Sequence, residues 1–120
     1  MVCVTPKLAT SFYFLGASVA LQTIVAPASN VAGIKVLAAA VVIRNITSGR
    51  VMAKTSAPTG VDDAAANTVA YRAALNGYAP NGVIEGQTFP ILLPPGLGLF
   101  AQKTDAEATS GFLVEYEVLQ

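Results

Sequence analysis

Carboxylates are the side chains whose spacing comes closest to a chemical site. They occur as three close pairs and one single residue, namely Asp62/Asp63, Asp105/Glu107, Glu115/Glu117 and Glu85. A glycosidase needs two carboxyl groups that face a common cleft, and a calcium site needs several oxygen ligands. Two of the pairs fall in segments that predict loops, the third alternates with apolar residues of a strand, and none matches a calcium-loop motif. We interpret them as solvated surface charge, so we predict no catalytic residue and no metal ligand.

The usual partners of a nucleophile are missing from the sequence. The chain has no histidine, which removes the commonest general base and the commonest zinc ligand. The single cysteine, Cys3, therefore has no histidine to activate it, and it has no second cysteine for an internal disulfide. Gly96-Leu97-Gly98 lacks the third glycine of a nucleotide-binding turn. These absences predict a protein that is not an enzyme and holds no cofactor.

Charged residues are unusually sparse. They make up 12% of the 120 residues, seven basic and seven acidic with a net charge of zero, whereas apolar residues make up 53%. Soluble domains carry about 25% charged residues, and a monomer of this mass exposes roughly 6,000 Å², so about 400 Å² of surface falls to each charge. We therefore expect partner subunits to cover much of the surface. The basic residues form no stripe, which predicts that no nucleic acid is bound.

β-Branched residues, glycines and prolines recur at short intervals, which is typical of β-sandwiches and barrels. We predict an all-β fold, an antiparallel β-sandwich with the jelly roll as the candidate arrangement and at most one short helix. Residues 1–120 form a single domain, of which residues 1–15 are a candidate N-terminal arm that extends onto a neighbour. The expected strands are Phe12–Leu15, Val19–Val25, Ile34–Ile46, Arg50–Thr55, Thr68–Leu75, Thr88–Leu93, Leu97–Lys103 and Phe112–Val118.

Turns and loops are predicted between these strands. Asn30–Gly33, Asn81-Gly82 and Pro94–Gly96 carry residues that accept the backbone angles of tight turns. The segment from Ala57 to Asn76 is expected to begin as an exposed loop and to end as a strand. Asp62 could open a short helix in this loop, because acidic residues are favourable near a helix N-terminus.

The longest apolar run, Ile34–Ile46, is apolar on both of its alternating faces. A strand that is buried on both sides has this pattern. One face is expected to line the core and the other to contact a partner, with alanines that permit close approach. The candidate interface residues are Ile34, Val36, Leu37, Ala39, Val41, Ile43, Phe12 and Phe14.

A ligand-binding alternative places an aromatic and polar groove among the loops. Its candidate residues are Asp62, Tyr78 and Asp105, where Tyr78 is predicted in a loop between Gly77 and Pro80. A further alternative rests on the uncharged stretch from Leu8 to Ile34, which could be a secretory signal peptide. Polar residues and a proline interrupt this stretch, so we interpret it as buried strands and predict no membrane span.

Two stretches carry a resemblance to a known class of proteins. One is the turn Asn30–Gly33 with the strand Ile34–Ile43. The other is Phe89–Phe100 with its proline–glycine turn, followed by a polar loop and the closing strand Gly111–Val118. This pattern resembles small β-sandwich virion structural proteins of tailed bacteriophages, of the capsid decoration (cement) type. It covers about half the chain, includes no diagnostic motif and transfers no functional residue.

The resemblance implies a homo-oligomer, with a trimer favoured, that sits between subunits of the major capsid protein. The expected location is the virion, after assembly in the host cytoplasm. The sequence thus leads to three functional hypotheses: a capsid cement subunit, a tail-fibre or spike head that binds a host receptor or glycan, and a secreted bacterial surface module.

Overall fold

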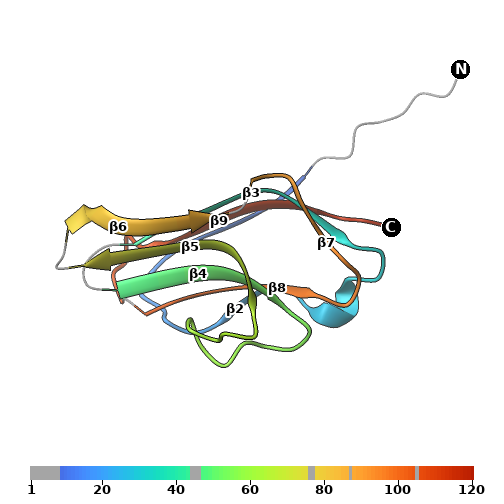
Figure 1. Cartoon of the computed structure of the whole chain (residues 1–120), viewed down its shortest axis with the longest axis horizontal. Helices are drawn as coiled ribbons and strands as arrows, with labels where there is room; N and C mark the ends of the chain where they lie inside the picture. The colour runs from blue at the N-terminus through green and yellow to red at the C-terminus, as the bar shows by residue number, and fades with distance from the viewer. Residues whose placement is uncertain (1–8, 44–46, 76–77, 87, 105) are drawn as a thin grey trace, which may run out of the picture.

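The computed structural model describes residues 9–43, 47–75, 78–86, 88–104 and 106–120 (Figure 1). It confirms the predicted all-β antiparallel sandwich. The one helix in these ranges is a single 3-10 turn, η1, at Pro27–Ser29. The strands are β1 (Thr10–Leu15), β2 (Gln22–Val25), β3 (Ile34–Val42), β4 (Thr47–Lys54), β5 (Asn67–Leu75), β6 (Tyr78–Gly86), β7 (Ile91–Leu93), β8 (Gly98–Lys103) and β9 (Gly111–Val118).

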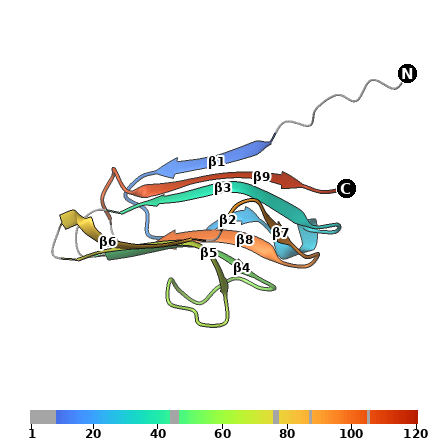
Figure 2. The same ribbon diagram turned by 45° about the horizontal axis from the view of Figure 1, so that its top comes forward.

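The strands form two stacked sheets. The first sheet has the order β1-β9-β3-β7, and the second has the order β2-β8-β4-β5-β6. All the pairings are antiparallel. Figure 2 shows β1, β9 and β3 as one layer above β8, β4 and β5. This strand order is that of a jelly roll, to which β6 adds one strand at the edge beyond β5.

A β-bulge in β3 decides which of its side chains point into the sandwich. Val36 lies opposite Tyr116 of β9, and Ala38 lies opposite Glu115, so Leu37 is an extra residue without a partner on β9. Such an insertion shifts the alternation of side chains by one position. The inward set is therefore even-numbered before Leu37 and odd-numbered after it, which explains why both faces of the run look apolar in the sequence.

The core fills the space between the sheets. β9 contributes alternate residues, as its sequence pattern predicted: Phe112, Val114 and Tyr116 are buried, and Leu113 is exposed. β4 and β8 supply small and medium apolar side chains from the other sheet. The buried cluster comprises Val25, Ile34, Val36, Val41, Ile43, Val51, Ala53, Val69, Ala70, Leu93, Leu99, Ala101, Phe112, Val114 and Tyr116.

Two of the predicted turns are joined by a buried asparagine. Asn30 donates hydrogen bonds from Nδ2 to the carbonyl oxygens of Pro94 and Leu97, both at 2.8 Å. Its Oδ1 accepts one from the amide of Gly33, also at 2.8 Å. Gly33 has a φ of 119° and Gly96 a φ of 89°, the left-handed values that favour glycine. Asn30 therefore holds the turn before β3 against the turn before β8.

Three local predictions are wrong. Residues 62–66 form turns, since the amides of Asp63 and Ala66 bond carbonyls three residues earlier and no helical ladder follows. Asn81-Gly82 lies inside β6 and is not a turn. Residues 10–15 of the predicted arm form β1, which pairs with β9 along its full length, while residues 1–8 lie outside the described ranges.

Candidate functional site

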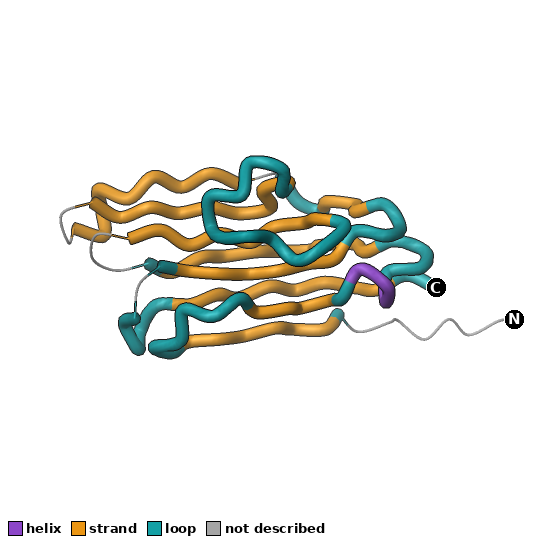
Figure 3. The backbone as a smooth tube through the Cα atoms, turned by 90° about the horizontal axis from the view of Figure 1, so that it is seen from below, coloured by secondary structure: helices purple, strands orange, loops and turns teal. Residues whose placement is uncertain are grey.

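The loop between β4 and β5, residues 55–66, lies over the outer face of the second sheet. Figure 3 shows it crossing in front of the strands, and Figure 2 shows it projecting from that side of the sandwich. Met52 of β4 and Phe100 of β8 lie opposite each other. Neither belongs to the buried cluster between the sheets, yet both are buried. Val61 and Ala66 of the loop are buried as well. We infer that the loop, together with Pro27 of η1 near Phe100, shields a second, small apolar cluster outside the sandwich.

Arg50 of β4 holds this loop in place. Its Nε donates to Thr68 Oγ1 at 2.7 Å, and its Nη2 donates to the same oxygen and to the carbonyl of Ala66 at 3.3 Å. Its Nη1 donates to the carbonyls of Val61 at 3.1 Å and Asp63 at 3.2 Å. A guanidinium has five N–H donors, so these five bonds use all of them. Every acceptor is a neutral oxygen.

Asp63, a residue of the loop itself, is a second anchor, and its charge is opposite to that of Arg50. Its Oδ2 accepts from Lys54 Nζ at 2.6 Å and from the amide of Thr59 at 3.1 Å, and its Oδ1 accepts from the amide of Ala65 at 2.9 Å. The hydrogen bond from Lys54, followed by those from the two amides, holds the pKa of Asp63 well below its ordinary value. Arg50 and Lys54, which precede and follow Met52 on β4, thus both bind the loop.

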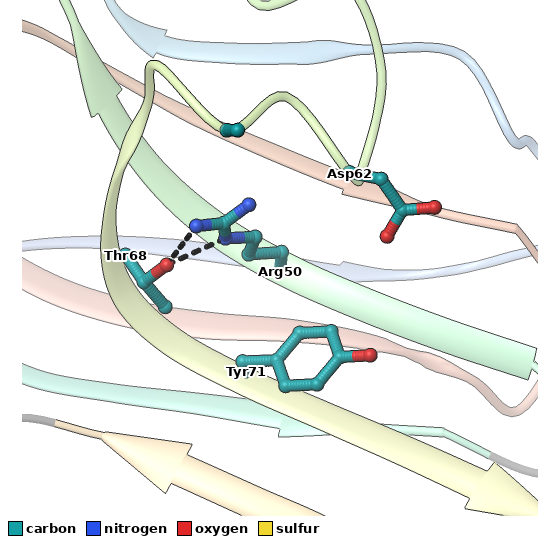
Figure 4. A pocket seen from close by; sticks show the side chains of 5 residues that line it. Arg50, Asp62, Thr68 and Tyr71 are labelled. Atoms are coloured by element: carbon teal, nitrogen blue, oxygen red, sulfur yellow. Dashed lines mark hydrogen bonds between the residues drawn. The ribbon is translucent and has the colours of Figure 1, made fainter.

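A cleft of about 290 Å³ opens between the loop and β5, lined by Arg50, Asp62, Ala64, Thr68 and Tyr71 (Figure 4). In this view the guanidinium turns toward Thr68, while the carboxylate of Asp62 and the hydroxyl of Tyr71 point to the other side. Because all five guanidinium donors are used, an anion would find no free donor on Arg50. The polar groups left for a ligand are a carboxylate and a phenol, which suit a hydroxyl-bearing molecule.

The predicted ligand residues are only partly placed. Asp62 is exposed and lines the cleft. Tyr78 begins β6 and is not in a loop, and its side chain and the whole of Asp105 lie outside what the structure describes. The sequence analysis missed Arg50 and Tyr71, which are direct cross-strand neighbours. The charge of Arg50 within an apolar strand was the signal that could have marked the outer face of β4.

The outer face of the first sheet carries a second candidate site. Across β1, β9 and β3, Tyr13 lies opposite Leu113, and Leu113 lies opposite Ala40. In the next row Leu15 and Val42 flank Gly111. The exposed fractions are 65% for Tyr13, 43% for Leu15 and 39% each for Val42 and Leu113. We call Tyr13, Leu15, Ala40, Val42 and Leu113 the apolar patch.

The predicted interface residues lie elsewhere. Ile34, Val36, Val41 and Ile43 are in the core between the sheets, so their assignment to a partner surface is wrong. Phe12, Phe14 and Ala39 are half-buried and pack against that core, and Leu37 is the half-buried bulge residue. The contact of this strand with a partner stays a prediction. Its outward residues are Lys35 before the bulge and Ala38, Ala40 and Val42 after it, because the bulge exchanges the two faces.

No protein-family model, curated protein or solved structure matches this chain. Among the described residues, no group of three or more acidic or cysteine side chains is placed to hold a metal ion. Within the same ranges, no helix has the length and apolar character to cross a membrane. The candidate sites therefore rest on the geometry of the cleft and of the apolar patch.

We expect Arg50→Met to destabilise the fold by about 1–3 kcal/mol, because it leaves loop carbonyls buried without their donors. Arg50→Lys should recover only part of this loss, since an ammonium has three donors instead of five and cannot reach all the acceptors around the edge of the planar guanidinium. The measurement is the free energy of urea unfolding, together with the rate of proteolysis within residues 55–66. An Arg50→Met protein that is as stable in urea and as resistant to proteolysis as the wild type would contradict the role of Arg50 in holding the loop.

The lowered pKa of Asp63 predicts acid sensitivity of the loop. Its contribution is fully present above the unfolded pKa, near 3.8, and is lost as the pH falls below that value toward the lower native pKa. Asp63→Asn removes the titration but keeps an oxygen that can accept from Ala65. The stability advantage of wild type over Asp63→Asn should therefore shrink between about pH 5 and pH 2 in urea titrations. A difference that stays constant over this range would disprove the assignment.

Proposed function

We propose that the protein is a virion structural protein of the capsid decoration (cement) type, which binds between capsid proteins and stabilises the shell. The observation that carries the proposal is the apolar patch, five neighbouring outward positions on the first sheet without one charged residue. An exposed patch of this kind is typical of a surface that another protein covers. The low overall charge and the resemblance to phage decoration proteins support the same function.

The two outer faces of the sandwich suit this role differently. On the second sheet the β4–β5 loop lies over the outer face. Met52 and Phe100, which belong to this face, are both buried, and Phe100 also lies near Pro27 of η1. On the first sheet no described loop covers the apolar patch, and the residues of the patch are exposed. A subunit that binds only the assembled shell stabilises that shell by mass action. The proposed location is the virion, with the major capsid protein as neighbour and further copies of the chain as partners.

The test uses particles that lack the protein and purified protein added back to them. Particles with the wild type should survive heating and osmotic shock better than particles without it. Leu113→Glu should weaken attachment at least about tenfold, because it places a charge in the middle of the patch. Binding is measured by co-sedimentation with the particles, and survival by the titre of infectious particles.

A matched control lies on the same sheet face. Leu92→Glu introduces the same charge at a position that is 67% exposed and lies opposite Lys35, away from the patch. This variant should attach like the wild type. Equal survival of particles with and without the protein would remove the cement function, and equal loss of binding in both variants would remove the patch as its site.

A second candidate function, a tail-fibre or spike head that recognises a host glycan, is favoured by the cleft. Asp62 can accept hydrogen bonds from sugar hydroxyls, and the ring of Tyr71 can stack on the apolar face of a sugar. The volume of about 290 Å³ lies at the lower end of small-ligand sites. Such a site would bind one or a few sugar units and would depend little on salt.

A glycan array with the purified protein tests this function. Tyr71→Ala should abolish any glycan signal, because it removes both the ring and the hydroxyl, and Asp62→Asn should reduce it, because an amide oxygen is a weaker acceptor than a carboxylate. Tyr13→Ala is the matched control, since it removes an exposed tyrosine from the other sheet. An array without any signal at high protein concentration would exclude the receptor-binding function.

A further inference from the structure

β1 forms an open edge of the first sheet. It pairs with β9 on one side, and no described strand lies on its other side. Its six residues, TSFYFL, include neither a charged residue nor a proline. Along such an edge, backbone N–H and C=O groups are available to another strand, and proteins normally block that pairing with prolines, charges, bulges or short strands.

The other three edges of the two sheets carry these blocks. β7 has only three residues, preceded by Pro90 and followed by Pro94 and Pro95. β2 has four residues and an irregular register against β8. β6 contains Pro80 and Glu85 within its span. Among the strands that the structure describes, β1 is therefore the edge on which no such device is present.

We propose that β1 pairs with β1 of a second copy of this chain, antiparallel and about a two-fold axis. Identical uncharged strands meet without repulsion, and an isologous contact uses the same edge in both subunits. The two first sheets then join into one continuous sheet of eight strands, because each contributes four. The apolar patches of both copies come to lie on the same face of the joined sheet. The inference concerns the subunit by itself and holds whether or not the protein attaches to a capsid.

The faces of β1 restrict the register of this pair. Phe12 and Phe14 pack inward, whereas Tyr13 and Leu15 are exposed on the outer face. Residues that lie opposite each other in an antiparallel pair share one face of the sheet. The two-fold axis must therefore pass midway between the two copies of one residue of β1. Centred on Phe12 it places Ser11 opposite Tyr13, and centred on Tyr13 it places the two copies of Tyr13 together.

A two-fold pair differs from the trimer that the resemblance favours. A closed trimer of strand pairings would need each β1 to meet a different edge of its neighbour. The three other edges carry the prolines, the short lengths and the charge described above, so they oppose that contact. The edge geometry thus leads to a dimer as the basic unit of association.

The mass of the full chain in solution tests the proposal, by light scattering and by sedimentation over a concentration series. The wild type should show a reversible species of twice the 12.3 kDa subunit mass. Ser11→Lys combined with Tyr13→Lys puts like charges opposite each other in both registers, and it should raise the dissociation constant about tenfold or more. In the single subunit the lysine at position 11 faces Glu115, which favours correct folding.

The control is Thr55→Lys combined with Ser56→Lys, which adds the same charge at two exposed positions of the β4–β5 loop. This protein should dimerise like the wild type, and circular dichroism should show that both double variants are folded. A wild-type monomer at high concentration, a trimer, or a dimer that the β1 variant leaves intact would each overturn the proposal. None of these results would by itself decide whether the protein binds a capsid, so the two proposals fail separately.

Discussion

The sandwich depends on a single apolar layer that both sheets must fill without a gap. β3 lies second from one edge of the first sheet, and its bulge at Leu37 lets it supply Ile34 and Val36 before the insertion and Val41 and Ile43 after it. Without the extra residue, either pair would point to solvent, because side chains of a strand alternate strictly. The same bulge turns the small residues Ala38 and Ala40 outward, and so it shapes the surface that we assign to binding.

Several of the few charged side chains of the chain hold the β4–β5 loop on the second sheet. Arg50 donates all five of its hydrogen bonds to neutral oxygens of the β4–β5 loop and of Thr68. Lys54 forms an ion pair with Asp63 of the same loop. These groups stabilise a loop that has little regular structure of its own. They are consequently lost as surface charge, which makes the accessible surface even less polar than the composition indicates.

For this reason the outer face of the second sheet is covered by a loop, whereas the outer face of the first sheet is exposed. The second sheet has its own cover, since Arg50 and Asp63 hold a loop over Met52 and leave a small polar cleft beside it. The first sheet exposes Tyr13 and Leu113 opposite each other, and Tyr13 belongs to the edge strand β1, which carries no proline or charge. A contact surface and an open edge on the same sheet favour a protein that works in contact with others. The cleft on the opposite side stays accessible in such an arrangement.

The sequence sufficed to predict the all-β class, the sandwich, and the alternating closing strand at Phe112–Val118, because period-two patterns and turn residues are local signals. It also determined the sparse charge. The fold was needed to establish which residues of Ile34–Val42 face the core, because the bulge depends on the pairing of β3 with β9 and leaves no mark in the composition. It likewise decided that Arg50 and Asp63 hold one loop, since each side chain bonds residues that β-sheet pairing and the loop's path bring close.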